Sequence, residues 1–228
     1  MIEKHEQTSS RDKIFDAILR AAPTAEADLD TIKAEAAAIL TESTNARPEL
    51  LADDAAEALV RRVEKGLVIG TSCECIPSLD QLPEAVKGFL GKYDLPAELK
   101  VQDKPCLKSL AWADIKTDVD IHNDNTVGLC FAEYGVAETG SFVVHSSDSM
   151  PVLLNFLPLY LIAVVPKSKI LHYMDDYAVI ANEIAACGET PRNMCLISGA
   201  SGTTDIEGVL VQGAHGPEVL HLIIVEDQ

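Results

Sequence analysis

From residue 67 onward, short apolar runs alternate with segments that have the periodicity of amphipathic helices. Continuous apolar runs are typical of strands that are buried on both faces, and helices between such strands cover those faces. The sequence therefore predicts an α/β fold with a mostly parallel sheet flanked by helices. The expected strands are 67–71, 99–102, 127–132, 141–145, 159–165, 194–198 and 219–225, and the expected helices in this part are 82–92 and 175–187.

The first part of the chain has helical rather than strand-like patterning and is rich in acidic residues. This change of pattern predicts a helical N-terminal segment over 1–48 and an α/β domain over 49–228. The segment is either an arm or a layer packed on the domain that follows. Helices are expected over 11–22, 25–40 and 49–65, with Pro23 ending the first and Gly66 ending the third.

The charge of the chain limits the classes of partner that it can bind. Lys and Arg number 18 against 36 Asp and Glu, which gives a net charge of -18. This charge repels phosphate backbones and anionic lipids, so neither nucleic acid nor a membrane surface is an expected partner. A small anionic ligand remains compatible, because the amides of one loop outweigh a distant surface field.

The sequence also bears on where the protein is located. The longest apolar stretch, 152–165, is shorter than the roughly 20 residues of a membrane span, and the charged start is unlike a secretory signal. We therefore expect a cytoplasmic protein.

The six cysteines are scattered and form no Cys-x-x-Cys pair. Disulfides, an iron–sulfur cluster or a structural zinc site are therefore not expected in this chain. The nearest pair, Cys73 and Cys75, follows an apolar run and is either inert or a redox or metal site at a strand end. The sequence contains neither dinucleotide-binding nor P-loop glycine motifs, and no cofactor is expected.

A loop rich in hydroxyls and glycines follows the apolar run 194–197, which we expect to be a buried strand. Glycines let the backbone approach a ligand, and hydroxyls and amides then face that ligand. The alternative is a plain turn followed by a helix whose N-cap is Thr204 or Asp205. The predicted ligand-binding residues of this loop are Ser198, Gly199, Ser201, Thr203, Thr204 and Asp205.

A second candidate site is the turn Glu138-Thr139-Gly140-Ser141 at a strand entrance. It combines a carboxylate with two hydroxyls, and Glu138 is a candidate catalytic residue. The alternative is a tight connection from which Glu138 points to solvent. Because ligands in open α/β sheets bind beyond strand ends, we expect this turn and the 198–205 loop to converge.

A third candidate lies just before the last strand, where His215 and Gly216 occur in Gly-Ala-His-Gly-Pro. Imidazole titrates near neutrality, so His215 is a candidate general acid or base, although a histidine that only supports a turn fits equally well. The histidines lack the paired spacing of metal ligands, and no metal site is predicted. The central prediction is that Thr139, Ser201 and His215 line one cavity.

Together, the motifs at 137–141, 197–207 and 213–217, with Leu220-His221 in the last strand, resemble the lactate utilization (LUD) domain family. Within that family the chain is most similar to the protein C group. The order and spacing of the motifs match the family pattern. One position departs from it, since Gly202 stands where the family usually has an arginine. If that arginine binds an anion in other family members, this chain lacks that contact with the anion.

The resemblance implies a fold like that of the sugar-phosphate isomerase and CoA-transferase superfamily. It also implies a role in oxidising L-lactate to pyruvate beside iron–sulfur-containing partner subunits, with this chain as an accessory or substrate-handling subunit. Two alternatives remain. One is an independent non-redox enzyme in which Glu138 attacks a CoA thioester or isomerises a sugar phosphate. The other is a regulatory module that binds a small carboxylate or another small anion without turnover.

Overall fold

The computed structural model describes residues 10–21, 28–41, 47–66, 70–205 and 207–226. The chain divides into two compact units, Met1–Arg47 and Pro48–Gln228. The first unit contains helices α1 (Ser10–Ala21) and α2 (Leu29–Thr41). The predicted first helix agrees with α1 to within one residue at each end. Asp28 begins α2, because its carboxylate accepts hydrogen bonds from the Asp30 amide (3.2 Å) and the Thr31 hydroxyl (3.1 Å); the start predicted at residue 25 lies outside the described residues.

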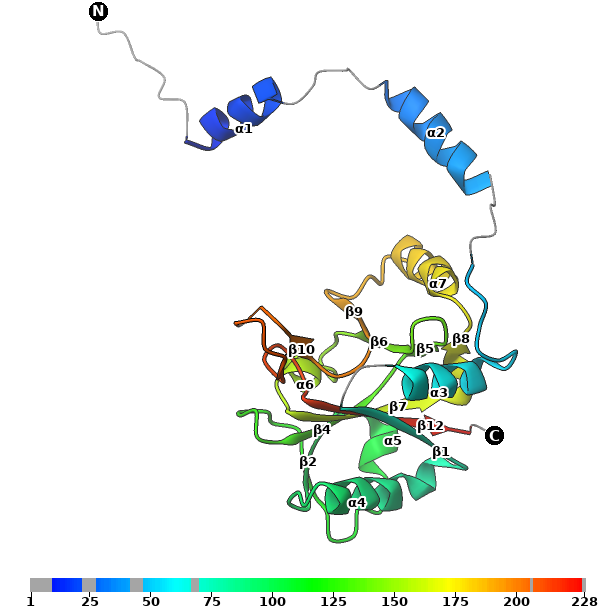
Figure 1. Cartoon of the computed structure of the whole chain (residues 1–228), viewed down its shortest axis with the longest axis vertical. Helices are drawn as coiled ribbons and strands as arrows, with labels where there is room; N and C mark the ends of the chain where they lie inside the picture. Colours follow the sequence, from blue (N-terminus) through cyan, green and yellow to red (C-terminus); the bar gives the residue numbers. More distant parts are fainter. Residues whose placement is uncertain (1–9, 22–27, 42–46, 67–69, 206, 227–228) are drawn as a thin grey trace, which may run out of the picture. The chain divides into compact units, whose positions relative to one another are not determined.

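A parallel sheet forms the centre of the second unit (Figure 1). Its order is β1-β12-β7-β4-β2-β3, and every neighbouring pair is parallel. The predicted α/β fold with a mostly parallel sheet is therefore confirmed. The strands are β1 (Thr71–Ile76), β2 (Glu98–Val101), β3 (Lys116–Asp118), β4 (Val127–Phe131), β7 (Tyr160–Pro166) and β12 (Val219–Val225). Most of the first predicted strand, 67–71, lies outside the described residues, and β1 begins where that prediction ends.

A second sheet of four strands has the order β8-β5-β6-β9. Only β5 and β8 are parallel in it; the other pairs are antiparallel. The predicted strands 141–145 and 194–198 belong to this sheet and not to the parallel one. The expected burial of 194–197 is only partly correct, since β9 is an edge strand with Met194 and Leu196 each more than a third exposed. The strands are β5 (Tyr134–Val136), β6 (Ser141–His145), β8 (Ile170–Leu171) and β9 (Met194–Ile197), and a separate hairpin pairs β10 (Gly202–Thr203) with β11 (Val211–Gln212).

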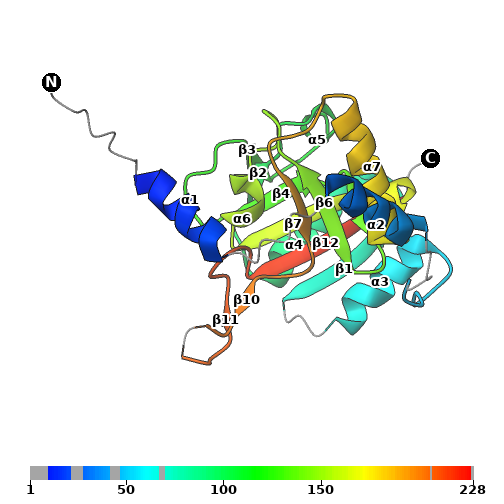
Figure 2. The same ribbon diagram turned by 90° about the horizontal axis from the view of Figure 1, so that it is seen from above.

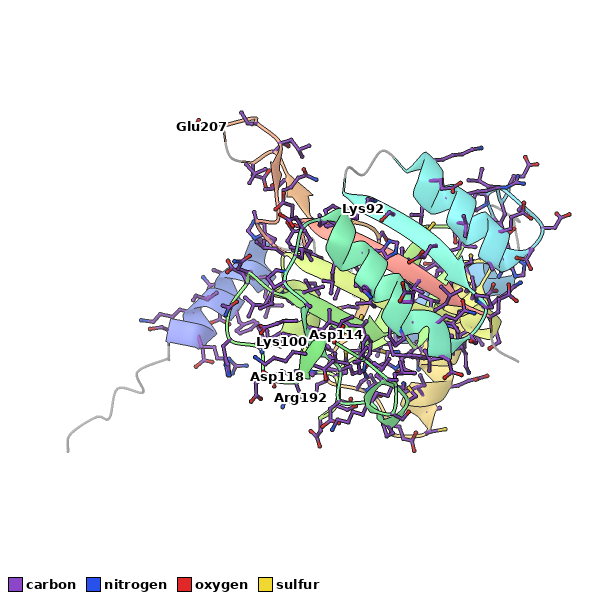
Figure 3. The ribbon with its side chains drawn as sticks, turned by 90° about the horizontal axis from the view of Figure 1, so that it is seen from below. Lys92, Lys100, Asp114, Asp118, Arg192 and Glu207 are labelled. Atoms are coloured by element: carbon purple, nitrogen blue, oxygen red, sulfur yellow. The ribbon has the colours of Figure 1, made fainter. Side chains whose placement is uncertain are left out.

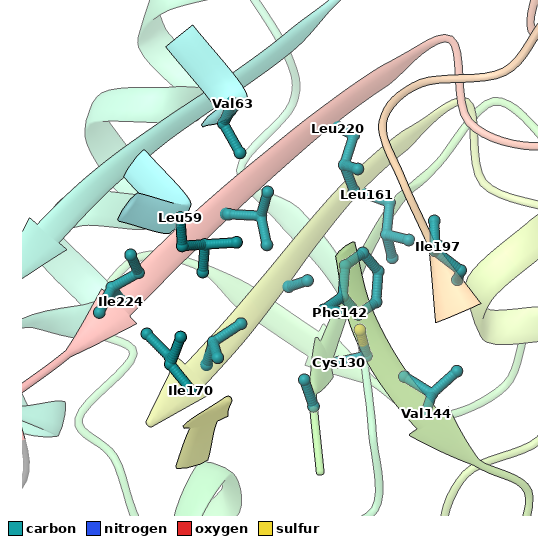
Figure 4. Close-up of a cluster of buried hydrophobic side chains, with 14 of the residues drawn as sticks. Leu59, Val63, Cys130, Phe142, Val144, Leu161, Ile170, Ile197, Leu220 and Ile224 are labelled. Carbon is teal, nitrogen blue, oxygen red and sulfur yellow. The ribbon is translucent and has the colours of Figure 1, made fainter. Parts of the chain in front are cut away.

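The two faces of the parallel sheet pack against different layers (Figures 1 and 2). On one face, Leu220 and Leu222 of β12 pack with Phe142 of the second sheet and Leu59 of helix α3 (Figure 4). On the other face, Ile223 of β12 belongs to the cluster formed with helices α4 and α5. Successive side chains of a strand point to opposite faces, so each central strand contributes to both cores. The helices of these layers are α3 (Ala55–Lys65), α4 (Leu82–Lys92) and α5 (Pro105–Lys108).

Local capping and turns explain where the remaining predictions need correction. Helix α3 begins at Ala55 and not at residue 49, because the Asp54 carboxylate accepts the Glu57 amide (2.9 Å) and caps the helix there. The apolar stretch 152–165 begins with a short helix, α6 (Leu153–Phe156), before it enters β7. Within the described part of the chain, no helix is long and apolar enough to cross a membrane. The remaining elements are the 3-10 turns η1 (Leu79–Gln81) and η2 (Lys167–Lys169) and the helix α7 (Met174–Ala186).

Candidate functional site

The turn between β5 and β6 is held close to helix α3. Gly140 has φ +69°, and a Cβ at this position would lie 2.9 Å from Cγ of Arg62. The Arg62 guanidinium donates a hydrogen bond from Nε to the backbone oxygen of Glu138 (2.7 Å). The turn therefore requires glycine for both its backbone angle and its close approach to Arg62.

The carboxylate of Glu138 faces the start of helix α7. The Met174 amide, at the first residue of that helix, donates a hydrogen bond to Glu138 Oε2 (2.8 Å). A carboxylate is stabilised in this place by the unpaired amides and the dipole of the helix. The partly exposed Glu138 side chain thus contacts α7, and its predicted catalytic role stays a prediction.

Three hydroxyls form a hydrogen-bonded chain across the second sheet. Thr139 Oγ1 lies 2.6 Å from Ser141 Oγ, and Ser141 Oγ is also hydrogen-bonded to Ser198 Oγ. The pairing of Phe142 with Ile197 explains this contact, since Ser141 and Ser198 are the next residues on adjacent antiparallel strands. Ser141 is 1% exposed, whereas Ser198 is exposed, so the chain leads from the core to the surface.

The loop after β9 and the segment before β12 are joined through Ser201. Its amide donates to the Pro217 oxygen (2.7 Å), and its backbone oxygen accepts the Gly213 amide (3.0 Å). The hydroxyl accepts the His215 amide (3.3 Å), while the His215 residue is exposed. Gly216 is buried against Ser201, with its Cβ position 3.4 Å from Ser201 Cβ.

The joined segments lie at the amino edge of the parallel sheet. The Ala200 amide donates to Thr71 Oγ1 (2.9 Å) at the first residue of β1, and the Leu220 amide donates to the Gly70 oxygen (2.8 Å). For these loops, the expected convergence of the 138–141 turn with the 198–205 loop is found at one end of the second sheet, where Ser141 contacts Ser198. The joined segments connect the second sheet at Ser198 with the amino edge of the parallel sheet at Ser201. A single cavity lined by Thr139, Ser201 and His215 remains a prediction.

The second half of the hydroxyl-rich loop forms a hairpin. Gly202 and Thr203 pair with Gln212 and Val211, and Thr203 Oγ1 accepts the Asp205 amide (3.3 Å). Of the predicted ligand residues here, Thr204 and Asp205 are exposed, and Glu207 lies at the outer part of this hairpin (Figure 3). The alternative of a helix capped by Thr204 or Asp205 is wrong, since the described residues that follow form a turn and β11.

The two closely spaced cysteines have properties of unreactive thiols. Burial, reinforced by Glu64, raises the pKa of Cys73 to about 11. Burial and Glu226 also raise the pKa of Cys75. A raised pKa disfavours the thiolate that binds metals or attacks disulfides. Among the residues with described positions, no group of three or more His, Cys, Asp or Glu side chains is arranged to hold a metal ion.

Two further features of the structure are not indicated by the sequence motifs. A cavity of about 430 Å³ lies at the carboxyl edge of the parallel sheet, where Phe131, Pro166 and Val225 end their strands and Lys169 adds a positive charge. On the α4 face of the same sheet, His221 contacts Ser72 and Glu74. The sequence contains one hint of this cluster around His221. Polar residues occur inside two strands, at positions whose side chains face a helix.

The LUD domain model matches residues 33–225 of the chain. Lactate utilization protein C of Halalkalibacterium halodurans is 39% identical over 103 residues, which is 45% of each chain. The protein of the same name from Geobacillus kaustophilus is 34% identical over 114 residues, 50% of this chain and 48% of the relative. That of Bacillus subtilis is 39% identical over 103 residues, 45% of this chain and 43% of the relative. The chain thus matches about half the length of these curated relatives.

A crystal structure of a DUF162 family protein from Deinococcus radiodurans superposes with a TM-score of 0.54 at 19% identity, covering 75% of this chain and 98% of that chain. This likeness supports the α/β fold alone. The family model covers most of both the helical and the sheet elements, and the resemblance carried by the three loop motifs is confirmed by it. The chain belongs to the LUD domain family.

Proposed function

We propose that this chain is a component of a cytoplasmic L-lactate utilization system, in which it handles the small carboxylate substrate or product. The proposal rests on membership of the LUD family and on relatives named lactate utilization protein C. In this proposal the iron–sulfur-containing lactate utilization subunits carry out the electron transfer. This chain acts as an accessory or substrate-handling subunit.

The observation that carries the ligand assignment is the junction of two hydroxyl-bearing clusters in one loop. Ser198 ends the Thr139–Ser141 chain, and Ser201 binds the His215 segment only three residues later. Hydroxyls and backbone amides are donors suited to carboxylate oxygens, and exposed Ser198 and His215 are accessible to a ligand. Gly202 supplies no positive charge there, so we expect weak binding that depends on hydrogen bonds.

The system-level test is reconstitution with the iron–sulfur subunits. L-lactate oxidation by the mixture is expected to require this chain, whereas the isolated chain without metal or flavin is expected not to oxidise L-lactate. Oxidation at an unchanged rate when this chain is left out would contradict its role as a component. Oxidation of L-lactate by the isolated chain would contradict the accessory role.

The site-level test measures binding of L-lactate and pyruvate by calorimetry to Ser201→Ala and Lys169→Met. Loss of the Ser201 hydroxyl removes a hydrogen-bonding group and is expected to weaken binding by about 10- to 150-fold, since a hydrogen bond to a charged group contributes roughly 1.5–3 kcal/mol. Lys169 lines the carboxyl-edge cavity and serves as the matched control. If only Lys169→Met weakens binding, the ligand belongs to that cavity and the loop assignment is wrong.

A further inference from the structure

Ser72, Glu74 and His221 lie together on the face of the parallel sheet that α4 covers. β1 and β12 are parallel neighbours, and Ser72 is directly opposite His221 in their register. Glu74 is two residues further along β1, so its side chain points to the same face as that of Ser72. On β12 the flanking residues of this face, Val219 and Ile223, belong to the α4 core. His221 thus replaces an apolar side chain in an otherwise apolar layer.

Both ring nitrogens of His221 are hydrogen-bonded. Nδ1 lies 2.8 Å from Ser72 Oγ, and Nε2 lies 3.0 Å from Glu74 Oε1. An ionised carboxylate only accepts hydrogen bonds, so the Nε2 proton points to Glu74. In the neutral ring, Nδ1 then carries the lone pair and accepts the Ser72 hydroxyl proton. This is the order of nucleophile, base and orienting carboxylate found in serine hydrolases, with the two ring nitrogens exchanged.

The imidazole ring is held in this orientation. His221 is 8% exposed, and the Phe89 ring of α4 stacks on it with centroids 5.2 Å apart and an interplanar angle of 24°. A base whose ring is fixed by packing and by its second nitrogen needs little reorganisation to accept a proton. The Ser72 hydroxyl is half-buried, and the Glu74 side chain is 42% exposed.

An open cavity of about 640 Å³ gives access to these groups. Ser72 and His221 line it together with Phe89 and Lys92, and Figure 3 labels Lys92 on α4. Nothing lies within 4 Å of the position of a Cβ at Gly88, so the helix leaves room beside the cavity. Ile76, Ala85 and Phe89 form its apolar lining, while Gln81, Glu84 and Lys92 are polar. This mixture fits a short apolar acyl chain joined to a polar leaving group.

We propose that Ser72 is a nucleophile activated by His221 and oriented by Glu74, and that this cavity accepts an acyl ester or thioester. Ser72 Oγ forms a bond to the carbonyl carbon while its proton passes to His221 Nδ1. The bond to the alcohol or thiol breaks, and the leaving group takes the proton back from His221. Water then attacks the acyl-serine while His221 Nδ1 accepts a water proton. The bond between the acyl carbon and Ser72 Oγ breaks, His221 returns the proton to Ser72 Oγ, and the carboxylic acid leaves. The proposal is independent of the lactate role.

The test is covalent labelling of the full chain with an alkyl fluorophosphonate, followed by peptide mapping. We expect a single phosphonylated residue, Ser72, and loss of labelling in Ser72→Ala. Ser109→Ala is the control, because Ser109 is an exposed serine outside this cavity whose hydroxyl donates to the Cys106 oxygen (3.2 Å) and has no histidine partner among the described residues. Its labelling is expected to equal that of the unmodified chain.

The role of the base is tested with His221→Asn, whose side chain keeps a polar group of similar size. Activation by a general base typically contributes about 10²–10⁴-fold, so the labelling rate of Ser72 is expected to fall at least about 100-fold. Circular dichroism identifies a variant that fails to fold, and Glu74→Gln then serves as the second variant, with an expected fall in rate. The proposal would be overturned if Ser72 is not labelled in the folded chain, or if Ser72 is labelled at the same rate in His221→Asn. The three residues would then form a hydrogen-bond network with a structural role only.

Discussion

At the residue scale, the backbone of the β5–β6 turn depends on a single glycine. Gly140 combines a positive φ with a close approach to Arg62. The sequence identified this turn as a glycine-bearing site beside hydroxyls. It did not identify Arg62 as the neighbour, because Arg62 is distant along the chain and its contact depends on the packing of α3.

We expect Gly140→Ala to lower the free energy of unfolding by about 1–3 kcal/mol, because a side chain at positive φ is strained and its Cβ meets Arg62. Gly91→Ala is the control, since its position in α4 is helical and no atom lies within 4 Å of its Cβ. That control is expected to raise stability by about 0.5–1 kcal/mol. Urea unfolding of both variants measures the difference, and equal stabilities would contradict this account of the turn.

The thiols provide a second prediction at this scale. The pKa of Cys73 is raised to about 11 by burial, so its thiolate becomes abundant only as the pH approaches that value. At pH 8 the thiolate fraction is about 10⁻³, and alkylation of Cys73 by iodoacetamide is expected to be slow. Exposed Cys187 is the internal reference. Mass spectrometry against time should show Cys187 modified first, and equal rates at pH 8 would exclude the burial effect.

At the element scale, helix ends are set by side chains that accept backbone amides. Asp54 determines the start of α3, and Glu138 lies at the start of α7 although it belongs to a distant turn. The sequence placed α7 within one residue at each end, because its apolar periodicity is local. It did not reveal the partner of Glu138, because that contact joins two elements through the fold of the second sheet.

Asp54→Ala removes the cap of α3, and we expect a loss of about 1 kcal/mol in the free energy of unfolding. Asp53→Ala is the matched control, because among the described residues it is the backbone oxygen of Asp53 that accepts a hydrogen bond, from His172 Nε2 (3.1 Å). That bond survives the substitution. Chemical denaturation distinguishes the two variants, and a larger loss for the control would contradict the capping role.

Glu138→Gln keeps an acceptor for the Met174 amide but removes the charge from the helix start. The expected loss of stability is about 0.3–1 kcal/mol and is smaller at high salt, because the interaction with the helix dipole is screened. Denaturation at low and high salt measures it. Lactate oxidation by the reconstituted system should be unchanged if Glu138 only supports α7; a large loss of turnover in a stable variant would instead support its catalytic role.

At the scale of the whole molecule, the buried clusters found among the described residues lie within the second unit. Their buried members fall between Ala56 and Val225. We therefore propose that the division predicted near residue 48 separates an N-terminal segment from a domain that folds alone. A chain of residues 48–228 is expected to keep its far-ultraviolet circular dichroism and a cooperative thermal transition. Loss of that transition would show that residues 1–47 complete the fold.

Sequence alone determined the class of fold and the family. Apolar runs such as 219–225 and the spacing of glycine and hydroxyl motifs are local properties, so they could be read without coordinates. Only the tertiary structure decided that the strands divide into two sheets. It also decided that the loop after β9 meets the segment before β12 at the amino edge of the parallel sheet, and that Ser72, Glu74 and His221 are neighbours. These arrangements depend on strand register and on packing between segments about 150 residues apart, and no local pattern encodes which strand lies beside which.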